Sequence, residues 1–247
     1  MFTGWAQTAI GNVRNDNEDS FWLGGKNNWY LALVADGMGG HQGGEVASQQ
    51  AAEMIRQTIE TNITKSGIVV DQMEKLLGDA IQAANKAIYR LGQSCSDLTG
   101  MGTTVTVALF IDHTVKIAQV GDSRAYLFRQ GKLRQLTNDH SLVQELVSSG
   151  SISPIEARFH PQRNLLTRVV GTAPDLEVDY FSLNTEPEDI FLLCTDGLTG
   201  ELTDDEIKAV LMSSPPDQAV KELVLEAICH GGHDNITVVL IRVGDRL

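Results

Sequence analysis

The sequence predicts an α+β fold in which mostly antiparallel sheets are covered by helices. The predicted elements run in the order strands, two long helices, many strands, two helices and a final strand. A doubly wound parallel sheet would instead alternate strands and helices regularly. Of the 247 residues, 42% are hydrophobic and 21% are charged, which argues against a disordered or fibrous protein. We expect one domain over 1–247, because single sheet-rich domains often reach roughly 200–250 residues.

The N-terminal part begins with strands and continues with two helices. The short run Ser20–Leu23 and the continuous apolar run Trp29–Ala35 indicate strands, and the second of them is typical of a buried strand. Apolar residues recur at helical spacing over Gly44–Ile59 and, more regularly, over Met73–Leu91. We therefore expect two amphipathic helices after the first strands.

Several strands follow these helices. Hydrophobic residues alternate over Thr103–Ile111, which indicates a strand with one apolar face, and Val115–Val120 indicates the next strand. Ala125–Phe128 and Lys132–Leu136 flank the pair Gln130-Gly131, and a glycine at this place permits a tight hairpin turn. We therefore expect these two runs to pair as a hairpin.

Residues 139–170 differ from the segments on either side. A short helix is expected near Ser141–Val147, followed by a loop-rich stretch that holds Gly150, Pro154 and Pro161. This composition predicts a mobile excursion from the core. The chain then returns to regular elements: a buried strand at Ile190–Thr195, helices at about 203–212 and 216–229, and a last strand at Ile236–Val243.

Aspartates occur at the ends of the predicted strands. Asp36, Asp122 and Asp196 each come at the end of a hydrophobic strand, with a glycine beside them. Asp234 precedes the last strand and Asp19 precedes a short one. Because sheets bring strand ends together, these carboxylates can converge, and each would raise the pKa of its neighbours. Divalent cations relieve that repulsion, and all-oxygen ligands suit Mg²⁺ or Mn²⁺ better than Zn²⁺.

Each of these aspartates also has a simpler explanation when taken alone. A single Asp-Gly pair is more often only a turn. Asp19 alone can cap a helix or turn, and Asp234-Asn235 alone can form an Asx turn. Coincidence becomes a poor explanation because all five aspartates share the same placement.

Six short motifs follow one another along the chain in a fixed order. They are Arg14-Asn-Asp-Asn-Glu-Asp19, Ala35-Asp-Gly-Met-Gly-Gly40, Gly100-Met-Gly-Thr-Thr104, Val120-Gly-Asp-Ser-Arg124, Thr195-Asp-Gly197 and Asp234-Asn-Ile-Thr237. Each motif alone is weak, but the ordered set is specific. With this set the sequence resembles the metal-dependent protein phosphatases, also called the PPM or type-2C Ser/Thr phosphatases, and its compact size is similar to that of the bacterial members.

The resemblance implies a more detailed fold than the hydrophobic periodicity does. It implies a four-layer α-β-β-α sandwich, with two central antiparallel sheets between pairs of helices, as a single phosphatase catalytic domain over 1–247. It also implies that 139–170 is the flap, a variable segment beside the active site. Loops in such a position can select substrates.

The resemblance further implies a centre of two Mn²⁺ or Mg²⁺ ions. Asp36 would bridge the two ions, and the Gly37 carbonyl would be a further ligand. Asp196 and Asp234 would complete the site of the first ion.

The remaining implied roles belong to the second ion, a third ion and the substrate. Glu18 and Asp19 would serve the second ion, directly or through water. Asp122 would help Asp196 hold a third, weaker ion. Arg14 would bind the substrate phosphate, because a guanidinium can contact two phosphoryl oxygens at once.

The activity implied is that of a protein serine/threonine phosphatase. A hydroxide that bridges the two ions would attack phosphorus in line, without a phosphoenzyme. The partners would be proteins phosphorylated on Ser or Thr and a cognate Ser/Thr kinase whose signalling is reversed. Two alternatives remain: a metal-dependent phosphoesterase of small molecules, and a catalytically weak phosphoprotein-binding module. The second predicts lost ligands, whereas Asp36, Asp196 and Asp234 are all present.

The proton donor for the leaving group differs from the family pattern. Many family members have a histidine directly after the Asp-Gly pair, and Met38 stands there in this sequence. A serine alkoxide is a poor leaving group and benefits from a proton. The candidates are a metal-bound water and His41, although His41 also fits a surface histidine near a helix start.

Other reactive residues fit structural roles better. Cys194 lies in an apolar run and is expected in the core rather than as a nucleophile. His230 and His233 have no third ligand at zinc spacing. Arg124 and Arg168 are expected in structural ion pairs.

Charge and cysteine content restrict the partners and the compartment. The formal net charge of −13 argues against nucleic-acid binding and against attachment to anionic lipid. It favours basic substrates, though weakly. The three cysteines have no CxxC spacing and no signal peptide or membrane span is apparent, so we expect a cytoplasmic monomer.

Overall fold

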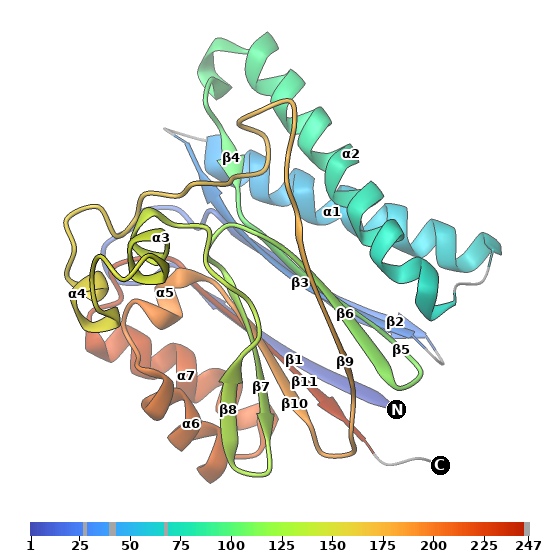
Figure 1. The fold of residues 1–247 in the computed structure, drawn as a ribbon, viewed down its shortest axis with the longest axis vertical. Coiled ribbons are helices and arrows are strands. Elements are labelled where there is room, and N and C mark those ends of the chain that lie inside the picture. Colours follow the sequence, from blue (N-terminus) through green and yellow to red (C-terminus); the bar gives the residue numbers. More distant parts are fainter. Residues whose placement is uncertain (27–28, 40–42, 67–68, 245–247) are drawn as a thin grey trace.

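Two antiparallel sheets pack against each other at the centre of the molecule, and helices cover the outer face of each sheet (Figure 1). The computed structural model describes residues 1–26, 29–39, 43–66 and 69–244. Within these ranges no helix is long and apolar enough to cross a lipid bilayer. The predicted α+β sandwich with helices on both sides is confirmed.

The first sheet has the strand order β2-β3-β5-β6-β9, and all neighbouring pairs are antiparallel. Helices α1 (Gly43–Ser66) and α2 (Met73–Ser94) cover its outer face, and the 3₁₀ turns Val70–Gln72 and Ser96–Leu98 flank α2. The strands are β2 (Asp19–Lys26), β3 (Trp29–Met38), β5 (Val105–Ile111), β6 (Thr114–Val120) and β9 (Asp179–Asn184), and the short β4 (Gly102–Thr103) pairs with the end of β3.

The second sheet has the order β1-β11-β10-β7-β8 and is also antiparallel. Helices α6 (Asp204–Ser213) and α7 (Pro216–His230) cover it, and the short α5 (Asp196–Thr199) follows β10. The strands are β1 (Phe2–Ala9), β7 (Arg124–Arg129), β8 (Lys132–Gln135), β10 (Ile190–Cys194) and β11 (Ile236–Val243). The predicted hairpin through Gln130-Gly131 is confirmed by the pairing of Arg129 with Lys132.

The flap segment 139–170 carries the short helices α3 (Leu142–Ser148) and α4 (Pro154–Arg158), which lie near α5 in Figure 1. Backbone hydrogen bonds join its two ends: Thr167 N–H donates to the His140 carbonyl at 2.9 Å, and Leu142 N–H donates to that of Leu165 at 2.9 Å. His140 N–H also donates to the Gly121 carbonyl at 2.9 Å. The base of the flap is therefore attached to the turn that carries Asp122.

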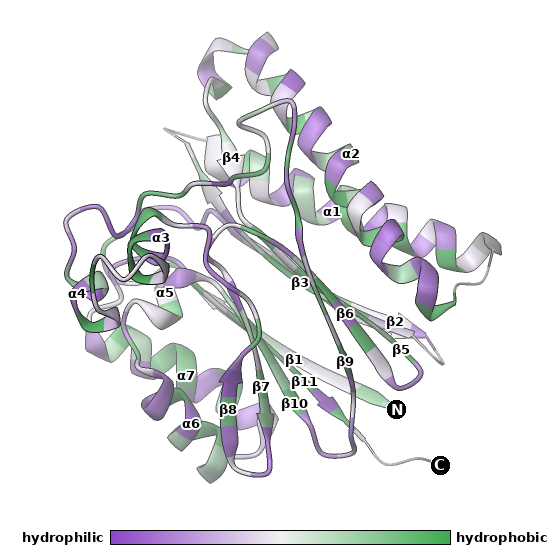
Figure 2. Cartoon of the chain, viewed as in Figure 1, coloured by the Kyte–Doolittle hydropathy of each residue, from purple (hydrophilic) through white to green (hydrophobic). Residues whose placement is uncertain are grey.

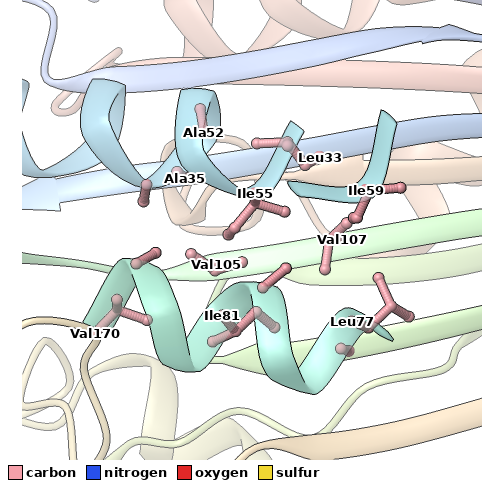
Figure 3. Packing of buried hydrophobic residues seen from close by; sticks show 14 of the residues in the cluster. Leu33, Ala35, Ala52, Ile55, Ile59, Leu77, Ile81, Val105, Val107 and Val170 are labelled. Atoms are coloured by element: carbon pink, nitrogen blue, oxygen red, sulfur yellow. The ribbon is translucent and has the colours of Figure 1, made fainter. Parts of the chain in front are cut away.

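Three hydrophobic layers hold the sandwich together: one between the sheets and one between each sheet and its helices. Figure 3 shows the first helix layer, where Ile55 of α1 and Ile81 of α2 point toward Val105 of β5. In Figure 2, α2 alternates hydrophilic and hydrophobic residues along its length, as expected of a helix with one buried face. Burial of these apolar side chains is the main favourable contribution to folding.

Several elements differ from the sequence-based expectation. β3 continues past Ala35 to Met38, because Gly37 and Met38 pair with β4. The predicted strand Thr103–Ile111 is divided at Thr104, and β5 is buried on both faces because the second sheet covers its inner side. Strands β1 and β9 and helices α4 and α5 were not predicted.

Candidate metal centre

Five aspartates from distant parts of the chain meet at one end of the sandwich. Asp19 begins β2 and pairs directly with Asp36 on β3. Asp122 lies in the turn between β6 and β7, Asp196 begins α5, and Asp234 lies just before β11. The negative charges of the other four all act on Asp36, so the structure brings together the aspartates that the sequence places at strand ends.

Burial and mutual repulsion raise the pKa values of these carboxyl groups. The pKa of Asp36 lies well above its ordinary value, first because of burial and then because of the charges of Asp19 and Asp196. Burial raises the pKa of Asp19 to about 7, although Thr195 donates a hydrogen bond to it at 2.8 Å. The pKa of Asp122 is also raised well above its ordinary value by burial and by Asp196. Such a group of carboxylates attracts cations strongly.

Two carboxylate oxygens in this cluster, Oδ1 of Asp19 and Oδ1 of Asp196, are buried and have no hydrogen-bond partner among the residues that the structure describes. A buried oxygen without a donor costs free energy, and the cost is larger for a charged group. A divalent cation would satisfy both atoms, and carboxylate oxygens are the ligands that Mn²⁺ and Mg²⁺ accept. Among the described residues, no three His, Cys, Asp or Glu side chains are already arranged to hold a metal ion. The chemistry of these oxygens fits a divalent cation, and the side chains would move closer together to bind it.

Arg14 lies at the edge of the cluster and holds one of its carboxylates. Its Nη2 donates to Oδ2 of Asp234 at 2.6 Å, and its side chain is 49% exposed. The negative charges of Glu18 and Asp36 also act on it. A half-exposed guanidinium beside the carboxylates can contact both the cluster and an anion that approaches from solvent.

Backbone and hydroxyl contacts fix the position of Asp36. Its N–H donates to Oγ1 of Thr104 at 2.9 Å, and its carbonyl accepts from the Thr104 N–H at 2.8 Å. The hydroxyls of Thr104 and Ser123 share a hydrogen bond at 2.7 Å. The motifs around Thr104 and Ser123 therefore connect the Asp36 strand to the turn that carries Asp122.

Glycine is required where the end of β3 approaches α1. A Cβ atom at Gly37 would lie 2.1 Å from the Gly44 carbonyl oxygen, and one at Gly44 would lie 2.6 Å from Cδ of Glu18. Any side chain at these positions would displace backbone or the Glu18 carboxylate. Burial raises the pKa of Glu18, which lies beside the aspartates as the sequence predicts.

Asn235, which the sequence suggests only as part of a turn, supports the candidate site through its side-chain hydrogen bonds. Its side chain is almost completely buried and bonds three backbone groups of the segment 10–18. Oδ1 accepts from Glu18 N–H at 2.8 Å, while Nδ2 donates to the carbonyls of Ile10 and Asp16 at 3.0 and 2.9 Å. Asn235 thereby joins the Asp234 loop to the segment that carries Arg14. The sequence feature that could have identified Asn235 is its place directly after Asp234 in the last motif.

The other candidates do not join the cluster, and His41 lies outside the described residues. Cys194 is fully buried, and burial raises the pKa of its thiol to about 12. The structural pairs are Arg124 with Asp139, Arg168 with Asp179, His230 with Glu206 and His233 with Glu201. Cys194 is therefore a core residue, and both arginines form the expected ion pairs.

Known proteins resemble this chain over nearly its whole length. A family model described as Protein phosphatase 2C matches residues 7–223. The serine/threonine phosphatase stp of Listeria monocytogenes serotype 4b (strain F2365) is 40% identical over 240 residues, which cover 95% of this chain and 93% of that protein. The crystal structure of the serine/threonine phosphatase Stp1 from Staphylococcus aureus is 36% identical, with a TM-score of 0.93 over 99% of this chain and 96% of that one. A PstP catalytic domain in complex with two manganese ions is 35% identical, with a TM-score of 0.88 over 99% of each chain.

Proposed function

Because this chain belongs to the protein phosphatase 2C family of serine/threonine phosphatases, we propose that its aspartate cluster binds two Mn²⁺ or Mg²⁺ ions for the hydrolysis of phosphorylated proteins. The observation that carries this proposal is a cluster of five aspartates in which one buried oxygen each of Asp19 and Asp196 has no hydrogen-bond partner within the described part of the chain. A related PstP domain binds two manganese ions, which supports the same number here.

The acidic residues can be assigned as ligands to individual ions. Asp36, on which the charges of the other four aspartates act, would be a ligand of both ions. We assign the Gly37 carbonyl, Asp196 and Asp234 to the first ion with it, and Asp19 and Glu18 to the second. Asp122, whose pKa is raised by Asp196, would share a third and weaker ion with Asp196.

The protein's own groups bind and orient the phosphate. When bound, the ions lower the pKa of water toward neutrality and stabilise negative charge on the phosphoryl oxygens. Arg14 would release Asp234 once that carboxylate binds a cation, and its two terminal nitrogens would then contact the phosphoryl oxygens. Cys194 is too deeply buried to be a nucleophile, which supports direct hydrolysis without a covalent intermediate on this residue.

Two candidates remain for the group that protonates the leaving group: His41 and a water in the metal centre. Met38, which follows the Asp36-Gly37 pair, cannot donate a proton. If His41 is the acid, His41→Ala slows hydrolysis of phosphoserine more than hydrolysis of an activated aryl phosphate, whose leaving group needs no proton.

The biological role that we propose is the reversal of Ser/Thr kinase signalling in the cytoplasm of a bacterium, by a monomeric enzyme. Relatives at 37–40% identity are bacterial serine/threonine phosphatases, which supports this setting. A cognate kinase and its phosphoproteins would then be the partners.

The deciding experiment measures phosphate release from a phosphothreonine peptide in Mn²⁺, in Mg²⁺ and in EDTA. We expect activity that requires the metal and that Asp36→Asn lowers by more than about 100-fold, since loss of residues that merely support ligands costs about 10- to 100-fold. Asp71→Asn removes an exposed carboxylate outside the cluster and is the matched control. Circular dichroism shows that each variant is folded.

Two results would contradict the proposal. Faster hydrolysis of nucleotides and sugar phosphates than of phosphopeptides would favour the small-molecule phosphoesterase. Folded wild-type protein that binds phosphopeptides without hydrolysing them in either metal would favour the binding module.

A further inference from the structure

A cleft of about 570 Å³ connects the aspartate cluster with the flap. Asp122 and Asp196 of the cluster contribute to its lining. Much of the remaining lining comes from α3, α4 and the turn after α4 in the flap, and from α5 and the start of α6. Arg124 of β7 and Gln135 of β8 also contribute, and α3, α4 and α5 lie together in Figure 1. A cleft of this volume falls within the range of about 300–1,000 Å³ that is typical of ligand sites. The part of a substrate next to its phosphorylated residue can therefore enter it.

Most charged groups of the cleft already have partners. Arg124 bonds Asp139 through two nitrogens, with Nε–Oδ1 at 2.9 Å and Nη2–Oδ2 at 2.7 Å. Asp204 accepts a hydrogen bond from the Tyr126 hydroxyl at 3.2 Å. Asp122 and Asp196 belong to the proposed metal centre. These groups are therefore not free to select the charge of a substrate.

Arg158 and Arg163 are the exceptions. Both line the cleft, both are exposed, and within the described ranges neither guanidinium forms an ion pair or a hydrogen bond to a side chain. The carboxylate of Glu206 influences Arg158 at a distance but is itself engaged at a helix start, where it accepts from Thr203 N–H and Oγ1 at 2.7 Å. Two guanidinium groups on one wall of the cleft are thus available to an incoming anion.

The flap presents these arginines from an ordered framework. Arg158 lies in the last turn of α4, which begins with a reciprocal capping box between Ser153 and Glu156. Arg163 N–H donates to the His160 carbonyl at 3.1 Å, in the turn that follows α4. Because the backbone that carries both arginines is hydrogen-bonded, only their side chains must become ordered on binding, and a guanidinium matches the geometry of a carboxylate or phosphate.

We propose that Arg158 and Arg163 select substrates that carry a second anionic group close to the phosphorylated residue. This inference rests on the proposed phosphatase function and names the substrate class of the same site. The second group is a carboxylate or a second phosphate, because both match the guanidinium geometry. The net charge of −13 repels anionic substrates, but this repulsion is screened beyond about 8–10 Å in physiological salt. The two arginines act on a substrate anion at shorter range.

The test compares phosphothreonine peptides that differ only in their neighbours. One has Asp and Glu near the phosphothreonine, one has Asn and Gln at the same places, and one has a second phosphothreonine. For wild-type protein in Mn²⁺ we expect kcat/KM about fivefold higher for both anionic peptides than for the neutral peptide. In Arg158→Gln/Arg163→Gln that ratio falls to within about twofold, whereas Arg90→Gln, an exposed arginine on α2, keeps it.

Binding provides a readout that does not depend on catalysis. Fluorescence anisotropy with non-hydrolysable phosphonate versions of the peptides should show the same ratios in Kd. A wild-type ratio near one, or a ratio that the double variant leaves unchanged, overturns the inference. A preference for the doubly phosphorylated peptide alone supports it and assigns the second group as phosphate. If no phosphopeptide is hydrolysed, the proposed function fails, and the anisotropy ratios still decide this inference.

Discussion

At the residue scale, the candidate centre depends on polar side chains that hold its acidic residues in place. Asn235 is the clearest example, because a single buried amide bonds three backbone groups on the segment that carries Glu18 and Arg14. Thr104 has a similar role, since it forms hydrogen bonds with both the N–H and the carbonyl of Asp36. Such supporting residues orient ligands and are costly to remove from metal sites.

Asn235→Ala should therefore weaken metal activation as well as stability. We expect kcat/KM to fall about 10- to 100-fold and the Mn²⁺ concentration for half-maximal activity to rise, because the Glu18 backbone loses its acceptor. Activity is measured on a phosphothreonine peptide over a Mn²⁺ titration.

The control for this substitution is Asn62→Ala on α1, which removes an exposed side chain that donates a hydrogen bond to the Thr58 carbonyl of its own helix. A purely structural role for Asn235 would lower the melting temperature while leaving the half-maximal Mn²⁺ concentration unchanged, and that result would contradict a positioning role.

At the element scale, helices α1 and α2 are held by one apolar face each. Ile81 on α2 is fully buried and packs against the first sheet (Figure 3). Ile81→Ala removes three carbon atoms from this layer and leaves a cavity, so we expect the free energy of unfolding to fall by about 2–5 kcal/mol. Urea unfolding followed by circular dichroism measures the change.

The control for this substitution is Leu225 on α7, a helix residue whose side chain is 59% exposed. Leu225→Ala should change the free energy of unfolding by no more than about 0.5 kcal/mol. Equal effects of the two substitutions would mean that the layer beneath α2 is not tightly packed.

Helices and strands with a regular hydrophobic period could be predicted from the sequence. Strands whose conformation depends on pairing with a distant segment could not. The interior of α2 carries a regular apolar face, and β11 was predicted with the same bounds that it has in the structure, Ile236–Val243. In contrast, β1 holds glycine and polar residues, and its pairing with β11 decides its conformation. The break between β4 and β5 at Thr104 also depends on a contact, namely the hydrogen bond to the Asp36 carbonyl.

At the scale of the whole molecule, the aspartate cluster links stability to pH and metal. The folded protein raises the pKa of Asp19 from 3.8 to about 7, and it raises those of Asp36 and Asp122 in the same direction. The folded state then binds more protons than the unfolded state between these values, so stability falls as pH rises from about 4 to 7. The lowered pKa values of Asp179 and Glu201 act in the opposite sense below about pH 4.5. The lowered pKa of His140 also acts in the opposite sense, below pH 6.5, but it is a single group against three raised carboxyl groups.

In EDTA, the melting temperature should therefore decrease between about pH 4.5 and pH 7.5. Added Mn²⁺ should raise it, and more at the higher pH, because protons compete with the metal for the same carboxylates. Thermal melts in EDTA and in Mn²⁺ across this range measure both effects. Asp19→Asn removes one titrating group and should flatten the EDTA curve. A melting temperature in EDTA that rises through this range would contradict the linkage.

From the amino-acid sequence alone one can infer the order of the main helices and strands, the oxygen-rich chemistry of the site and the aspartates that meet there. This is possible because hydrophobic periods and strand-end positions are local properties of the chain. The side chains that support that site, such as Asn235 and Thr104, could be identified only from the folded structure. The same holds for Arg158 and Arg163, charges beside the site that have no ion-pair partner among the described residues. Hydrogen bonds and ion pairs join residues more than 200 positions apart, as Arg14 and Asp234 are, so no local pattern records them.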